Sequence, residues 1–264
     1  MNQYSDDTQL RHRFPVPLQS TTTDRLTACV SAPLDWFLRN RVKTNVSKTE
    51  LLYLWSSFRR SKPVLDPLLV GGVTVVPSPS VKILGVTLDR HLNIELHVST
   101  VCKSAYHQIH LIGKIRKFLT LSAAKTLVIS TILSGLDFCN GILAGLPDEL
   151  IKKLQRVQNA AARLVLQADR RADSSTLLRR LHWLPVLQRT HFKILTMVFR
   201  CVQGNAPLYL SSLIEPHSQP RPGLRSSGSR NLSIPTAQTA HYGERAFSRL
   251  GPTLWNALPE EIKS

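Results

Sequence analysis

The chain has little cysteine, and the spacing of the few cysteines it has excludes two classes of protein. Its 4 cysteines contain no C-x-x-C pair, so neither a zinc module nor a disulfide framework is indicated. His107 and His110 lie one helical turn apart, but no third ligand is near them in the sequence, which favours solvated side chains over a zinc site. We therefore expect an intracellular protein with reduced thiols and no zinc.

The sequence also lacks a segment typical of secretion or membrane insertion. Its first ten residues contain Asp6 and Asp7 and no apolar core, unlike a signal peptide. The run 126–146 has roughly the length of a membrane span, but it contains Asp137, Asn140 and three glycines, which the bilayer interior disfavours. We expect a buried helix followed by a turn in this run, and no membrane partner.

Acidic residues are scarce relative to basic ones, and this imbalance indicates a class of partner. Lys and Arg number 34 against 17 Asp and Glu, which gives a net charge of +17 and a pI near 10.3. Within residues 96–205 the numbers are 16 against 5, a balance of +11. Such a composition favours a polyanionic partner, and nucleic acid is the first candidate.

Residues 1–95 alternate short apolar segments with turn residues and are predicted to be α+β. Apolar residues recur at helical spacing from Leu26 to Leu38, after Asp24, which is a residue type that caps helices. We expect this helix to bend near Pro33. Four later segments predict strands, namely 51–55, the two arms of a hairpin at Gly71-Gly72, and 81–88.

Residues 96–205 show helical periodicity and are predicted to form a bundle of four to five helices. The first helix carries an apolar stripe and, along another line, basic residues that step by four and three: Lys103, His107, His110, Lys114 and Lys117. The helix that opens at Pro147-Asp148 carries a second basic edge, formed by Lys152, Arg156 and Arg163. Each row is either a phosphate-binding surface or a solvated face, as most charged helix faces are.

Residues 206–264 are predicted to form a linker and a docking segment. The stretch 216–228 is rich in Pro, Ser, Gly and Arg, which is typical of a flexible basic linker or a simple spacer. The last residues include Phe247, Trp255 and Leu258. Their apolar surface is sufficient to dock onto the bundle but too small for a separate domain.

Several runs follow one another along nearly the whole chain and together carry a family resemblance. The first is Tyr4-Ser5-Asp6-Asp7, and the others lie at 35–51, 81–89, 157–165, 181–186 and 254–259. In this order they resemble the second half of a reverse transcriptase from a vertebrate non-LTR retrotransposon of the long interspersed class. The resemblance implies a partial polymerase palm at residues 1–95, followed by a mainly α thumb-like helical bundle.

The resemblance also implies roles for particular residues. Asp6 and Asp7 would be catalytic carboxylates that hold Mg²⁺, and Lys48 would protonate the departing pyrophosphate. The run 81–89 resembles the primer grip, in which the backbone at Leu84 and Gly85 would meet the primer end. The two basic rows would contact RNA or an RNA/DNA duplex. Without the resemblance, adjacent aspartates near a chain start are most often a solvated turn or a helix cap.

The sequence departs from the family in the parts that catalysis needs. Family members place another metal-binding aspartate on an earlier strand, with the fingers and the nucleotide pocket earlier still, and these have no counterpart in the 264 residues. Pro15 and Pro17 are also expected to interrupt the second strand of the catalytic hairpin. We therefore expect a truncated reverse transcriptase that is inactive alone. The alternatives are a helical nucleic-acid-binding module without chemistry, and a relic without function.

Overall fold

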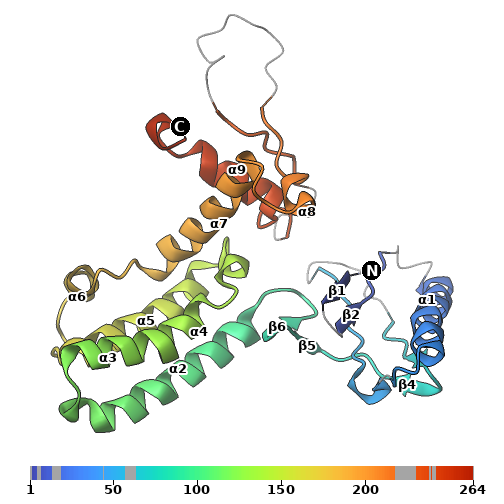
Figure 1. The fold of residues 1–264 in the computed structure, drawn as a ribbon, viewed down its shortest axis with the longest axis horizontal. Helices are drawn as coiled ribbons and strands as arrows, with labels where there is room; N and C mark the ends of the chain where they lie inside the picture. The colour runs from blue at the N-terminus through green and yellow to red at the C-terminus, as the bar shows by residue number, and fades with distance from the viewer. Residues whose placement is uncertain are drawn as a thin grey trace, which may run out of the picture. The chain divides into compact units, whose positions relative to one another are not determined.

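The computed structural model describes residues 2–4, 7–13, 19–43, 45–56, 64–217, 230–237, 239 and 242–263, with only the backbone for 2–4, 7 and 19–21. The chain divides into two compact units, Met1–Leu96 and His97–Ser264. In its described part, the first unit contains a long helix and three two-stranded antiparallel sheets, whereas the second is helical (Figure 1). The described protein is therefore of mixed α+β class, as the sequence predicts.

The long helix of the first unit, α1, spans Gln19–Arg39 and starts earlier than the predicted cap at Asp24. Polar residues are accommodated in it because the hydroxyls of Thr27 and Ser31 each donate to the carbonyl four residues earlier, at 3.0 Å. Pro33 lies inside the helix and removes one backbone donor from its ladder. The helix thus begins five residues before the predicted cap.

The N-terminal strands β1 (Asn2–Tyr4) and β2 (Asp7–Gln9) pair antiparallel, with Tyr4 opposite Asp7. The expectation that prolines leave this hairpin without a second strand is wrong. The partner strand lies before both Pro15 and Pro17, so neither proline interrupts its ladder. Ser5 and Asp6 lie outside the described residues.

The hairpin predicted at Gly71-Gly72 is confirmed. It consists of β3 (Leu68–Val70) and β4 (Val73–Val75), with Val70 opposite Val73. Both glycines have positive φ, 55° and 80°, as a two-residue primed turn requires. One face of the hairpin forms a small core with α1, which contributes Leu26, Val30 and Leu34. Val46 and Leu51, from the segment between α1 and the hairpin, complete this core.

The strand predicted at 51–55 is absent from the structure. Leu51 forms a single bridge with Pro77, and its carbonyl accepts the N–H of Ser78 at 2.8 Å. The N–H of Trp55 donates instead to the carbonyl of Arg90 at 3.1 Å. Because the backbone bonds of this apolar segment go to two different neighbours, it does not form one continuous ladder.

A further correction concerns 81–88, which is a hairpin and not one strand. β5 (Ser80–Ile83) pairs antiparallel with β6 (Val86–Asp89), and the chain turns at Leu84 and Gly85, whose φ angles are 47° and 85°. The side chains alternate with a period of two on both arms, so the pattern did not reveal the turn. A positive φ is uncommon for a leucine, which explains why Leu84 gave no turn signal.

A buried carboxylate organises the segment after β6. Asp89 is only 6% exposed, and its two oxygens accept the backbone N–H groups of His91, Asn93 and Ile94 at 2.9, 3.2 and 2.9 Å. Three donors satisfy the carboxylate without a cation. The amide oxygen of Asn93 then accepts the N–H of Glu95 at 2.9 Å and caps the next helix.

The second unit begins with helices that lie side by side in Figure 1. α2 (Glu95–Ile115) ends at the 3-10 turn η3 (Arg116–Phe118). Thr120 caps α3 (Leu121–Val128), because its hydroxyl accepts the N–H of Ala123 at 3.2 Å. A π-helical turn, η4 (Ile129–Leu133), joins α3 to α4 (Ser134–Asp137). The helical path therefore continues past Gly135 to Asp137.

Three further helices follow along the chain. α5 (Asp148–Leu166) starts after Pro147, as predicted, α6 spans Ser174–Leu181, and α7 spans Val186–Val202. Asp173 caps α6, because its carboxylate accepts the N–H groups of Ser175 and Thr176 at 3.3 and 2.9 Å. Hydrogen bonds from the side chains and backbones of Ser175 and Thr176 hold the pKa of the Asp173 carboxyl well below its usual range.

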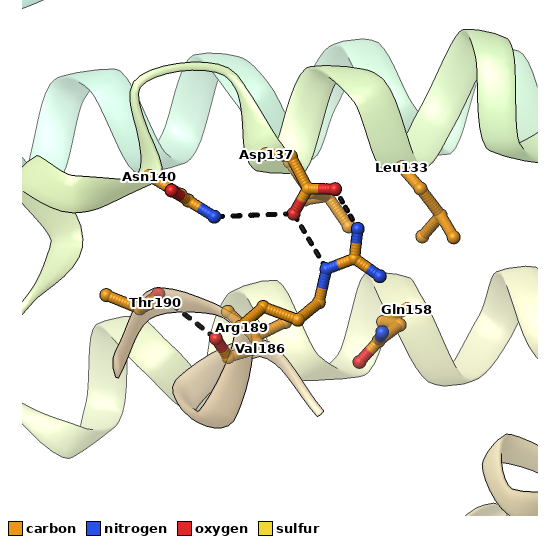
Figure 2. Close-up of a pocket in the computed structure, with 8 residues that line it drawn as sticks. Leu133, Asp137, Asn140, Gln158, Val186, Arg189 and Thr190 are labelled. Carbon is orange, nitrogen blue, oxygen red and sulfur yellow. Dashed lines mark hydrogen bonds and ion pairs between the residues drawn. The ribbon is translucent and has the colours of Figure 1, made fainter. Parts of the chain in front are cut away.

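A polar cluster fixes the start of α7 against α4 and α5 (Figure 2). Arg189 forms a two-point ion pair with Asp137, in which Nε lies 2.7 Å from Oδ1. The fully buried Gln158 donates to the carbonyl of Leu184 at 2.8 Å. Gln155 accepts the N–H of Val186, the first residue of α7, at 2.9 Å. These hydrogen bonds and the ion pair therefore fix the first turn of α7 on its neighbouring helices.

The C-terminal segment belongs to the second unit. It contains α8 (Leu208–Ser211), α9 (Phe247–Asn256) and the 3-10 turn η6 (Glu260–Ile262). α9 packs on α7 so closely that a Cβ at Gly251 would lie 2.8 Å from Cγ2 of Val198. Most of the linker predicted at 216–228 lies outside the described residues.

Candidate nucleic-acid interface

A row of basic side chains follows the exposed side of α2. At about 100° per residue, four of them fall within an arc of about 60°. We call them the α2 basic ridge: Lys103, His107, His110 and Lys114, all exposed. The buried apolar residues of the helix lie on the opposite side, and they are Val98, Ala105 and Ile112. The predicted row is therefore one face of a helix whose other face is anchored in the core.

The charges of this ridge are not neutralised locally. Within the described part of the chain, none of its four side chains forms an ion pair or a side-chain hydrogen bond. The ridge extends about 16 Å from Lys103 to Lys114, with a basic residue at each turn. Two lysines and two histidines in such a line favour an anionic ligand that repeats along its length.

Lys117 does not continue the α2 ridge in the predicted register. It lies in η3, beyond the end of α2, and its Nζ sits 4.9 Å from the centroid of the Phe118 ring. Phe118 is 76% exposed, and Tyr106, on the flank of α2, is 45% exposed. The sequence interpretation missed these two rings, although aromatic residues interleaved with basic ones are a signal of nucleic-acid binding.

The second predicted row, on α5, is only partly a free basic surface. Arg156 is exposed and Lys152 is exposed but paired with Glu149 at 3.2 Å. Arg163 is half-buried, and its Nη2 donates to the carbonyl of Ala172 at 3.2 Å and to the hydroxyl of Ser174 at 2.7 Å. Its guanidinium ties α5 to the start of α6. Contact of Arg163 with nucleic acid stays a prediction, although these bonds already engage its guanidinium.

Arg116 is a basic residue whose role the sequence did not reveal. It is 8% exposed, and all three guanidinium nitrogens donate to carbonyls, namely those of Leu164 at 3.0 Å, Leu119 at 2.9 Å and Val165 at 2.6 Å. Two of these carbonyls belong to the last turn of α5. Arg116 thus satisfies the open C-terminal end of that helix and joins it to α2.

Burial shifts the pKa of two titratable groups on the less exposed side of α2. Burial lowers the pKa of His97, because it disfavours the charged form of the imidazole. Burial raises the pKa of the Cys102 thiol, and the nearby Lys153 partly opposes that effect. All four cysteines are free. The positive charge of α2 is consequently confined to its exposed side.

The predicted catalytic residues are described only in part. Asp6 lies outside the described residues, and for Asp7 the structure gives the backbone, in β2. Lys48 is the last residue of the 3-10 turn η2 (Val46–Lys48), where its side chain is exposed. Among the described residues there is no group of three or more His, Cys, Asp or Glu side chains suited to a metal ion. The Mg²⁺ site therefore remains a prediction.

The predicted primer-contact residues Leu84 and Gly85 are both exposed at the tip of the β5–β6 hairpin. A tip of this kind presents backbone N–H and carbonyl groups to solvent. Glycine at the second position leaves one side of the turn without a side chain. The structure thus brings these two residues together in a turn, and contact with a primer stays a prediction.

Comparison with protein-family models, with curated proteins and with solved structures gives no match to this chain. In the described part of the chain, no helix is both long and apolar enough to cross a membrane.

Proposed function

We propose that the helical unit binds nucleic acid through the phosphate backbone, and that the chain derives from a reverse transcriptase of a non-LTR retrotransposon. The first unit would then be a partial palm and the second a thumb-like bundle. The proposal of descent rests on the ordered runs from Tyr4-Ser5-Asp6-Asp7 to 254–259. A helical module that binds nucleic acid without any polymerase chemistry is the second candidate.

The observation that carries the binding proposal is the α2 basic ridge. A solvated helix face usually mixes charges of both signs, because pairs of opposite charge support the helix. The body of α2 after its first residue, Glu95, contains no Asp or Glu. A rigid row of basic groups binds a repeating anion with little loss of conformational freedom. Because phosphates carry no base identity, binding through this ridge would tolerate any sequence.

The test is the salt dependence of binding. The variant replaces the two lysines of the ridge and the neighbouring lysine of η3, as Lys103→Gln, Lys114→Gln and Lys117→Gln. For duplex binding, we expect it to lower the slope of log K against log salt by about two to three units. Glutamine keeps helix propensity, so the fold should persist. Binding of the 264-residue chain to RNA and to an RNA/DNA duplex would be titrated by fluorescence anisotropy at several salt concentrations.

A matched control separates a defined surface from general attraction by net charge. Arg170, Arg179 and Arg180 are exposed and belong to the same unit, and no ion pair or side-chain hydrogen bond engages them in the described residues. Changing all three to Gln removes the same charge and should alter the slope by less than about one unit. An equal loss in both triple variants, or no loss in the α2 variant, would refute the proposed interface.

We further expect no polymerase activity from the 264-residue chain with Mg²⁺ or Mn²⁺. Nucleotidyl transfer uses two metal ions, and Asp6-Asp7 alone provides too few carboxylates to position both. Primer extension on an RNA template would measure this directly. Template-dependent extension that disappears in Asp6→Ala would show instead that the chain assembles a complete site.

A further inference from the structure

Two phenylalanines on α7 point away from the core of the second unit. Phe192 and Phe199 are 65% and 44% exposed. At about 100° per residue they lie within about 20° of each other, and about 180° from the centre of the buried stripe. That stripe consists of Val186, Thr190, Ile194, Val198 and Cys201. We call Phe192 and Phe199 the α7 phenylalanine ridge.

The rings of this ridge are free, and each is followed by a cation. Neither ring stacks on another aromatic ring among the described residues. Lys193 and Arg200 are exposed, and within the same described residues neither forms an ion pair or a side-chain hydrogen bond. Rings and cations both repeat every seven residues, which is about 10.5 Å along the helix axis. α7 contains no Asp or Glu.

We propose that the α7 phenylalanine ridge is a stacking site for single-stranded nucleic acid. Each ring would take one unpaired base on its face, and Lys193 and Arg200 would contact the phosphates beside those bases. Stacking accepts every base, because each has a π-face. This inference rests on the proposed function and extends it, since it assigns the helical unit a preference for single-stranded segments at a site other than α2.

The charges on α7 favour a nucleic acid over a protein helix as the occupant. Among the positions next to the rings, Gln188 and Thr196 are polar, whereas Leu195 and the 45% exposed Val202 are apolar. The cations beside the rings and the lack of acidic residues on α7 complement a polyanion.

The ring test compares leucine and tyrosine replacements. In the 264-residue chain, Phe192→Leu with Phe199→Leu keeps apolar bulk but removes both π-faces. We expect its affinity for a labelled single strand of about 12 nucleotides to fall by about 30-fold or more. Phe192→Tyr with Phe199→Tyr retains the rings and should stay within about threefold of the unmodified chain. Duplex affinity should change less than about twofold, because paired bases are already stacked.

The charge test uses Lys193→Gln with Arg200→Gln. We expect the salt slope on the single strand to fall by about one to one and a half units. The matched control, Arg179→Gln with Arg180→Gln on α6, should leave the slope within about half a unit. Equal losses from the two pairs would overturn a defined phosphate contact at α7.

The outcomes separate this inference from the proposed function. If the leucine pair leaves single-strand binding unchanged while the α2 triple variant still lowers the duplex slope, the α7 site is refuted and the α2 interface stands. If the unmodified chain binds neither strand nor duplex, both are refuted. If the leucine pair abolishes self-association and leaves oligonucleotide binding intact, the ridge is a protein contact and the inference is wrong. Selective loss on the single strand with rescue by tyrosine supports it.

Discussion

Replacing Arg116 by Met should lower the free energy of unfolding of the helical unit by about 3–5 kcal/mol. The Arg116 guanidinium donates to the carbonyls of Leu119, Leu164 and Val165 at 2.6–3.0 Å, in a place where the side chain is 8% exposed. Methionine fills similar volume but donates nothing, so these carbonyls lose their partner away from water. Urea denaturation followed by helical circular dichroism would measure the loss.

Two further variants test whether geometry or charge is responsible. Arg116→Lys keeps the charge but lacks the planar fork that reaches three carbonyls, so we expect about half of the loss. Arg156→Met, at an exposed position on α5, removes the same groups and should change stability by less than about 0.5 kcal/mol. A loss below about 1 kcal/mol for Arg116→Met would contradict a capping role.

Arg116 also shows why the sequence alone could not distinguish buried, structural basic residues from exposed ones. It lies between Ile115 and Lys117, so nothing in composition or spacing distinguishes it from the solvated lysines around it. Its burial depends on the end of α5, far along the chain. The same is true of Arg163, because its bonds go to Ala172, which lies before α6, and to Ser174, the first residue of α6. Long-range carbonyl partners leave no local signal.

Periodicity predicted the helical unit well because burial on one face is a local, repeating property. α5 starts after Pro147, which was expected to open it, and the exposed row on α2 lies opposite its buried apolar residues. The errors occurred where one residue pattern fits two different structures. The alternation at 81–88 fits one strand or two arms of a hairpin, and the positive φ angles of Leu84 and Gly85 separate the two structures.

The rings on α7 were missed for a related reason. Helical periodicity draws attention to residues that share one buried stripe, and Phe192 and Phe199 lie outside the buried stripe of α7. Large apolar residues that fall on the opposite face are an informative exception, because burial cannot explain them. Their spacing of seven residues could have been recognised before the structure was known.

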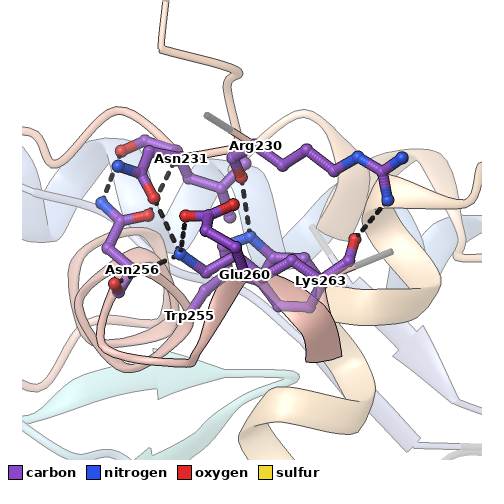
Figure 3. A network of polar contacts seen from close by, with 7 residues as sticks. Arg230, Asn231, Trp255, Asn256, Glu260 and Lys263 are labelled. Atoms are coloured by element: carbon purple, nitrogen blue, oxygen red, sulfur yellow. Dashed lines mark hydrogen bonds and ion pairs between the residues drawn. The ribbon is translucent and has the colours of Figure 1, made fainter. Parts of the chain in front are cut away.

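Replacing Trp255 by Ala should destabilise the whole helical unit by about 3–5 kcal/mol, and not only its C-terminal segment. Trp255 is 3% exposed and packs in one core with Val198 and Cys201 of α7. Its Nε1 also donates to the carbonyl of Arg230 at 2.9 Å (Figure 3). Because α7 and α9 share this core, a cavity at Trp255 should loosen both helices.

Amide hydrogen exchange can test this coupling along the chain. We expect exchange in α7 to accelerate by about 100-fold in Trp255→Ala, in parallel with exchange in α9. The matched control is Trp36→Ala, because Trp36 is 59% exposed on α1 and its loss should cost less than about 1 kcal/mol. Trp255→Phe keeps a ring in the core and should lose about half as much as alanine. Faster exchange confined to residues 242–263 would mean that the C-terminal segment is an appendage, which α7 does not need for its stability.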